Sequence, residues 1–142
     1  MRILFVCLGN ICRSPAAEAI MRALAPGLTL DSAGTGNWHV GEPPYAPMQA
    51  AAAARGLDLS GLRARQFTAA DFDAFDLIVA MDRKNLADIA ALRPLGHPTP
   101  LRTMAARDVP DPYYTRDFDG CLDLLERANR SLLADISGWQ DR

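Results

Sequence analysis

The chain has 142 residues, of which 49% are hydrophobic and 23% charged, which excludes a disordered chain and fits one globular domain over residues 1–142. Its 15 basic and 17 acidic residues give a formal charge of −2, so no overall positive field exists for nonspecific nucleic-acid binding. No apolar run approaches the roughly 20 residues of a membrane span. We expect a cytoplasmic protein that neither binds nucleic acid nor inserts into a membrane.

The predicted elements alternate between strand and helix along the chain. Short apolar runs indicate strands over residues 3–6, 28–33, 76–80 and, more weakly, 99–102. Helices are predicted over residues 15–24 and 47–55, near 72, and over 83–92 and 118–137. Their ends are marked by Pro15, Pro47, Thr68 and Asp82 as starts or caps and by Gly138 as the last stop. This order predicts an α/β fold, a parallel sheet covered by helices on both faces.

The segment between the first strand and the first helix has the composition of an anion-binding loop. It consists of Cys7, Leu8, Gly9, Asn10, Ile11, Cys12, Arg13 and Ser14, and we call residues 7–14 the cysteine loop. A short loop that leads into a helix can aim backbone N–H groups at a phosphate. Gly9 allows close backbone approach and Asn10 tolerates a left-handed conformation. Arg13 can bind two phosphate oxygens, which leaves Cys7 facing phosphorus.

The cysteines of this chain support different interpretations. Alone, Cys7 fits a small hydrophobic residue that ends a buried strand, but the joint pattern of Cys, five residues, Arg, Ser and Pro favours a nucleophile. The helix N-terminus and the cation would favour its thiolate, to which Ser14 can donate. Cys12 either packs or forms a reversible disulfide with Cys7. Cys121, on the apolar face of the last helix, is predicted to lie in the core.

Two further segments carry side chains suited to an aryl phosphate. Asp111 lies between two prolines and is a candidate general acid, with Tyr113 and Tyr114 beside it as aromatic surfaces. The alternative is a Pro-Asp-Pro turn with exposed tyrosines. Trp38, in the loop after the second predicted strand, either walls the entrance to the site or anchors its own loop. The two histidines lack the spacing of metal ligands, so no metal is expected.

The sequence resembles the low-molecular-weight protein tyrosine phosphatases over essentially its whole length. The resemblance rests on residues 6–15, 31–35, 76–82 and 111–114, in that order. It implies a small four-stranded parallel sheet flanked by helices on both faces, in a single domain. It also implies a cysteine-dependent phosphatase that hydrolyses phosphotyrosine through a phosphocysteine intermediate, without a cofactor. One departure is that Tyr45-Ala46-Pro47 stands where many members carry Asp-Pro-Arg.

The resemblance implies a role for each candidate residue. Cys7 would be the nucleophile, Arg13 the phosphate clamp and Asp111 the general acid. A hydrogen-bond network that shapes the loop would be formed by Asn10, Ser14 and Ser32. The cleft for the phosphotyrosine ring would be lined by Leu8, Trp38, Tyr113 and Tyr114.

Two other functions are weighed against phosphatase activity. A thiol-relay arsenate reductase needs further cysteines that reach Cys7, and none lies between Met81 and Pro110. A noncatalytic phosphotyrosine-binding module would have lost Cys7, Arg13 or Asp111. The expected partner is a tyrosine-phosphorylated protein, and the chain itself is expected to be a monomer or to associate weakly.

Overall fold

The computed structural model describes residues 1–140. This part of the chain contains one four-stranded sheet. The strands are β1 (Arg2–Cys7), β2 (Thr29–Gly34), β3 (Leu77–Ala80) and β4 (Leu101–Thr103). Their order is β2-β1-β3-β4, and all three pairings are parallel. The predicted four-stranded parallel sheet is thereby confirmed. The carboxyl ends of β1 and β2 meet where Cys7 pairs with Gly34, which places the cysteine loop at that edge.

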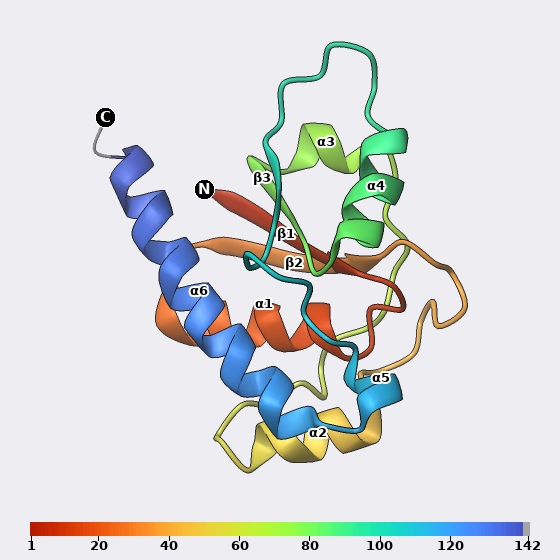
Figure 1. Cartoon of the computed structure of the whole chain (residues 1–142), viewed down its shortest axis with the longest axis vertical. Coiled ribbons are helices and arrows are strands. Elements are labelled where there is room, and N and C mark those ends of the chain that lie inside the picture. Colours follow the sequence, from red (N-terminus) through yellow and green to blue (C-terminus); the bar gives the residue numbers. More distant parts are fainter. Residues whose placement is uncertain (141–142) are drawn as a thin grey trace.

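Helices cover both faces of the sheet. They are α1 (Arg13–Leu24), α2 (Ala46–Ala53), α3 (Asp71–Ala74), α4 (Arg83–Ala91), α5 (Pro112–Thr115) and α6 (Phe118–Gln140). Figure 1 shows α1, α2 and the long α6 on one side, and α3 and α4 on the other. Within residues 1–140, no helix is both long and apolar enough to cross a bilayer.

The central strands are apolar throughout because both of their faces are buried. Ile3 and Phe5 of β1 belong to the core shared with α1 and α6. Leu4 and Val6 point to the opposite face, where they share a smaller core with Ile89 of α4. The continuous apolar run in the sequence is therefore the expected signature of an inner parallel strand.

Two of the predicted helix ends are wrong. Thr68 does not cap α3, whose cap position is Ala70; the Asp71 carboxylate instead accepts from the backbone N–H of Thr68 at 2.9 Å. Gly138 does not end α6, which continues to Gln140, because this glycine does not adopt the positive φ of a helix stop. Thr68 still takes part in the turn before α3, since its carbonyl oxygen accepts from the backbone N–H of Asp71 at 3.0 Å, but the cap position lies two residues later.

The other helix and strand ends either match the predicted ones or differ from them by a few residues. α1 begins at Arg13, two residues before the predicted Pro15, and β4 lies slightly later than expected. The sequence did not predict the short helix α5. Asp82 is the predicted cap of α4, since its carboxylate accepts from the backbone N–H of Asn85 at 2.7 Å.

Replacing Leu4 with Ala removes a fully buried side chain from the central strand. Because a cavity remains, we expect the free energy of unfolding to fall by about 2–5 kcal/mol, measured by urea denaturation. The matched control is Leu95→Ala, since Leu95 is fully exposed; its effect should stay within about 0.5 kcal/mol. Equal losses in the two variants would contradict this placement of Leu4.

Candidate active site

The cysteine loop curls around the thiol of Cys7. The backbone N–H of Asn10 donates to Cys7 Sγ at 3.2 Å, and Ser14 Oγ lies 3.0 Å from the same sulfur. Asn10 adopts a left-handed φ of 57°, a conformation that asparagine tolerates. A Cβ on Gly34, at the end of β2, would lie 2.8 Å from the carbonyl oxygen of Leu8, so only glycine lets the neighbouring strand approach the loop this closely.

A buried network of side chains holds the loop in this shape. Asn10 Nδ2 donates to Ser14 Oγ at 2.7 Å and to Ser32 Oγ at 3.0 Å. Asn10 Oδ1 accepts from the backbone N–H of Arg65 at 3.0 Å. Ser32 Oγ in turn donates to Glu18 Oε1 at 2.8 Å. The structure thus joins the three residues expected in the network and adds Glu18 and Arg65, which the sequence analysis missed.

Arg65 is itself anchored on one strand, β2, and one helix, α3. Its side chain pairs with Asp31 of β2 and Asp71 of α3, each at 3.0 Å. Burial works against the charge, but Asp71 and Asp31 outweigh it and raise the pKa of Arg65. Its carbonyl oxygen accepts from the backbone N–H of Gly34 at 2.8 Å. The segment that holds Asn10 is therefore fixed by charged contacts as well as by backbone bonds.

Arg13 is buried, with only 2% of its surface exposed, and it contacts two other segments. Its Nη1 donates to Asp82 at 2.8 Å and to the carbonyl oxygen of Val109 at 2.9 Å, while Nη2 lies 3.4 Å from Asp111. Burial works to lower the pKa of Arg13, but Cys7, Asp82 and Asp111 raise it more, so the guanidinium stays charged. Among residues 1–140 its Nε has no hydrogen-bond partner.

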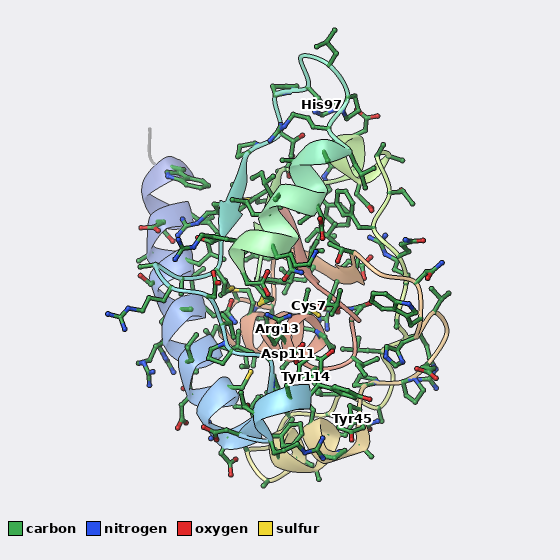
Figure 2. The ribbon with its side chains drawn as sticks, turned by 45° about the vertical axis from the view of Figure 1, so that its right-hand side comes forward. Cys7, Arg13, Tyr45, His97, Asp111 and Tyr114 are labelled. Atoms are coloured by element: carbon green, nitrogen blue, oxygen red, sulfur yellow. The ribbon has the colours of Figure 1, made fainter. Side chains whose placement is uncertain are left out.

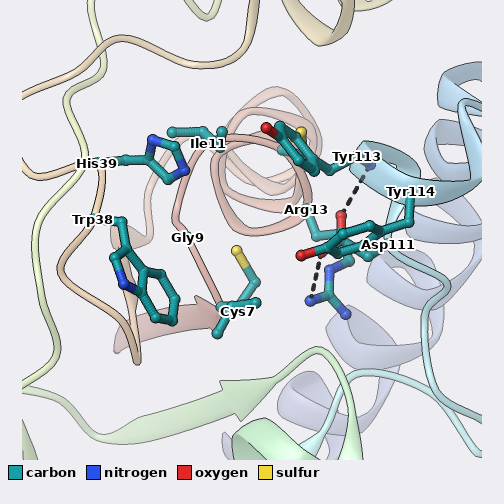
Figure 3. A pocket seen from close by; sticks show the side chains of 11 residues that line it. Cys7, Gly9, Ile11, Arg13, Trp38, His39, Asp111, Tyr113 and Tyr114 are labelled. Atoms are coloured by element: carbon teal, nitrogen blue, oxygen red, sulfur yellow. Dashed lines mark hydrogen bonds and ion pairs between the residues drawn. The ribbon is translucent and has the colours of Figure 1, made fainter.

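A pocket of about 270 Å³ opens above the thiol. It is lined by Cys7, Leu8, Gly9, Ile11, Cys12, Arg13, Trp38, His39, Asp111, Tyr113 and Tyr114. Figure 3 shows the sulfur of Cys7 facing the space between Trp38 and the two tyrosines, with the Asp111 carboxylate between Arg13 and Tyr113. All four predicted cleft residues line this pocket. His39 is an additional wall residue, and a lone histidine in a loop gave no signal for it.

Asp111 is held at the pocket by α5. Its carboxylate caps this short helix by accepting from the backbone N–H of Tyr113 at 3.1 Å. Asp111 therefore lies at a helix start, where the sequence analysis had weighed a simple turn. Trp38 and Tyr114 are exposed by 69% and 71%, which leaves broad aromatic surfaces at the mouth of the pocket.

Tyr45 joins the cysteine loop to α5. Its backbone N–H donates to the carbonyl oxygen of Ile11 at 2.8 Å, and its ring lies 5.1 Å from that of Tyr113. Arg116 donates to the Tyr45 hydroxyl at 3.1 Å and lies over its ring. Figure 2 shows Tyr45 on the same side of the molecule as Asp111 and Tyr114, with His97 at the far end. The departure at Tyr45 thus supplies an aromatic contact between two walls of the site.

The other two cysteines are buried and, like Cys7, have free thiols. Burial, reinforced by Cys7 and Asp111, raises the pKa of Cys12. Burial likewise raises the pKa of Cys121 to about 12, and its predicted place in the core is confirmed. A buried neutral thiol is a poor nucleophile, which disfavours a relay through Cys121. The reversible disulfide between Cys7 and Cys12 stays a prediction.

Comparison with known proteins gives the same family over nearly the whole chain. A family model described as low molecular weight phosphotyrosine protein phosphatase matches residues 2–140. The low molecular weight protein-tyrosine-phosphatase YfkJ of Bacillus subtilis is 40% identical over 94% of each chain. The solved protein tyrosine phosphatase of Entamoeba histolytica, with Hepes in its active site, has a TM-score of 0.90 at 34% identity over 99% of each chain. Wzb of Vibrio vulnificus, solved with benzylphosphonate, has a TM-score of 0.86 at 26% identity and covers 94% of this chain and 97% of its own.

The fold and these matches define a phosphoric monoester hydrolase of the protein-tyrosine-phosphatase class. The chain belongs to the low molecular weight phosphotyrosine protein phosphatase family, as its sequence predicted. Neither alternative function receives support from these relatives.

The buried thiols should resist alkylation in the folded chain. Iodoacetamide reacts with thiolates, and at about pH 8 a pKa of about 12 leaves about one Cys121 thiol in ten thousand ionised. We expect peptide mapping by mass spectrometry to find Cys12 and Cys121 unmodified in the native chain. The control is the same reaction in guanidinium chloride, where both should be modified. Rapid native modification of Cys121 would contradict its raised pKa.

Proposed function

We propose that the chain hydrolyses phosphotyrosine in proteins by a two-step displacement. In the first step the Cys7 thiolate attacks phosphorus, the bond from phosphorus to the tyrosine oxygen breaks, and Asp111 gives its proton to that oxygen. In the second step Asp111 takes a proton from a water molecule, whose oxygen attacks phosphorus. The phosphorus–sulfur bond then breaks, which releases inorganic phosphate and restores the thiolate.

The observation that carries this proposal is the position of the Cys7 sulfur at the floor of the pocket. Its two contacts, the N–H of Asn10 and the hydroxyl of Ser14, can both donate hydrogen bonds to the sulfur. When the phosphorus–sulfur bond breaks, the same contacts can stabilise the departing thiolate. The same two donors thus serve the Cys7 sulfur as nucleophile in the first step and as leaving group in the second.

Arg13 binds the phosphate oxygens of the substrate in this proposal. It is charged and buried, and contacts with Asp82 and Val109 fix its guanidinium from behind. Its Nε has no hydrogen-bond partner among residues 1–140, so it can donate to a phosphate oxygen, which would remove the cost of an unsatisfied buried donor. Together with the N–H groups at the start of α1, it supplies the preorganised positive potential that phosphoryl transfer requires.

The aromatic walls favour phosphotyrosine as the substrate. Trp38, Tyr113 and Tyr114 line the pocket, and aromatic faces pack well against a flat phenyl ring. The solved complex of the relative Wzb contains benzylphosphonate, a phosphonate on a phenyl-bearing carbon. A phosphoserine would have to bring its peptide backbone between these rings to reach the thiol, because its side chain is shorter by the length of the ring.

Matched phosphotyrosine and phosphoserine peptides test the function. We expect the wild-type chain to release phosphate from the former at least about a hundredfold faster, because only the longer side chain places phosphorus beside Cys7. Cys7→Ser should abolish turnover, since a serine hydroxyl is not ionised here.

The control for folding is vanadate binding, measured by isothermal titration calorimetry, which Cys7→Ser should retain. Turnover by Cys7→Ser at the wild-type rate would refute the mechanism.

The role of Asp111 is tested by Asp111→Asn. We expect kcat for phosphotyrosine to fall by about 10²–10⁴-fold, because an amide cannot protonate the leaving oxygen. The loss should be smaller for p-nitrophenyl phosphate, whose leaving group needs less protonation.

Asp108→Asn is the matched control, since Asp108 pairs with the exposed Arg83 at the surface, and it should retain full turnover. Equal losses on the two substrates in Asp111→Asn would rule out general-acid catalysis by this residue.

A further inference from the structure

A second groove adjoins the pocket above Cys7. It has a volume of about 390 Å³, and Ile11, His39 and Tyr113 line both depressions. The groove and the pocket are thus separated by a wall of these shared side chains. A peptide that leaves the pocket in this direction advances about 3.3 Å per residue, so it crosses the wall within a few residues of the phosphotyrosine.

The far side of the groove is apolar. It is built by Pro43, Pro44, Tyr45 and Ala46, and the last two belong to the segment in which this chain departs from many family members. Tyr45 is fixed by its backbone bond to Ile11 and by the guanidinium of Arg116. The groove therefore has a preorganised apolar wall, which reduces the entropic cost of binding a side chain there.

Two polar side chains of the groove, Glu42 and Gln49, already have hydrogen-bond partners. The carboxylate of Glu42 is paired with His39 Nδ1, and the side-chain amide of Gln49 donates to the carbonyl oxygen of Pro44 at 2.7 Å. No other charged residue lines the groove among residues 1–140. Because the rest of the lining is mostly apolar and the Glu42 carboxylate is already hydrogen-bonded to His39, the groove suits an apolar side chain better than a basic one.

We infer that this groove is a specificity subsite for an apolar side chain that flanks the phosphotyrosine in the substrate protein. The inference rests on the proposed function, because it needs a peptide substrate in the pocket above Cys7. The occupant is a leucine-like residue of the same peptide, and its burial against Tyr45 and Ala46 lowers the free energy of the bound peptide.

Phosphotyrosine peptides with alanine at every flanking position test the subsite. In each of four further peptides, one leucine replaces the alanine one or two positions before or after the phosphotyrosine. We expect one placement to raise kcat/KM by about tenfold, the lower end of the effect of one methylene group in an apolar pocket. A lysine in the same position should give no gain.

Ala46→Phe should fill the groove and reduce the leucine preference to within about twofold. The matched control is Ala53→Phe, the same change at the other end of α2 and outside the groove, which should keep the full preference. Because the measurement is a ratio of two peptides on one enzyme, a change in overall turnover cancels. Pro43→Asp, which places a charge in the groove without altering α2, should also remove the preference.

The inference is overturned by any of three results. These are a wild-type chain without a leucine preference at any position, a preference that survives both Ala46→Phe and Pro43→Asp, or a lysine peptide that exceeds the leucine peptide. Turnover of p-nitrophenyl phosphate separates the two levels of the proposal: if the wild-type chain lacks it, the proposed function fails, and if it is present without a peptide preference, only the subsite fails.

Discussion

The left-handed turn at Asn10 is the constraint on which the site depends. It lets one backbone N–H reach the Cys7 sulfur, while the Asn10 side chain contacts Ser14, Ser32 and the backbone of Arg65. A non-glycine residue in this conformation is strained, and asparagine tolerates it better than most. The surrounding hydrogen bonds hold the turn in place, so the geometry at the thiol is set before a substrate arrives.

Arg13 is a second fixed point, set by contacts rather than by backbone conformation. A buried guanidinium needs charged partners, and Asp82 and Asp111 supply them from two different segments. Asp82 also caps α4, so one carboxylate both starts a helix and orients the arginine. The position of the cation is thus coupled to the packing of α4 against the sheet.

The sequence predicted those site residues that belong to recognisable short motifs. Cys7 and Arg13 belong to one short segment between a strand and a helix, and that local pattern was sufficient. Glu18 and Arg65 were missed because their importance comes from contacts with Ser32 and Asn10; Asn10 lies 55 residues away from Arg65 in the sequence.

The same limit explains the errors in the fold. Thr68 has a capping preference, but the buried Asp71 takes its backbone N–H and also binds Arg65. Gly138 remains helical although glycine is common just beyond helix ends. Thr68 thus makes its contact with Asp71 through its backbone, while Gly138 has open space around its Cβ position and simply continues the helix.

The long helix α6 has a consequence for the order of events during synthesis. Its 23 residues are among the last of the chain, and it packs on α1, the helix that carries Arg13, Ser14 and Glu18. The cysteine loop and α1 are therefore synthesised before α6, so the apolar flank of α1 stays uncovered until α6 has emerged from the ribosome. A chain without α6 would expose that flank to water, on the helix that carries Arg13 and Ser14.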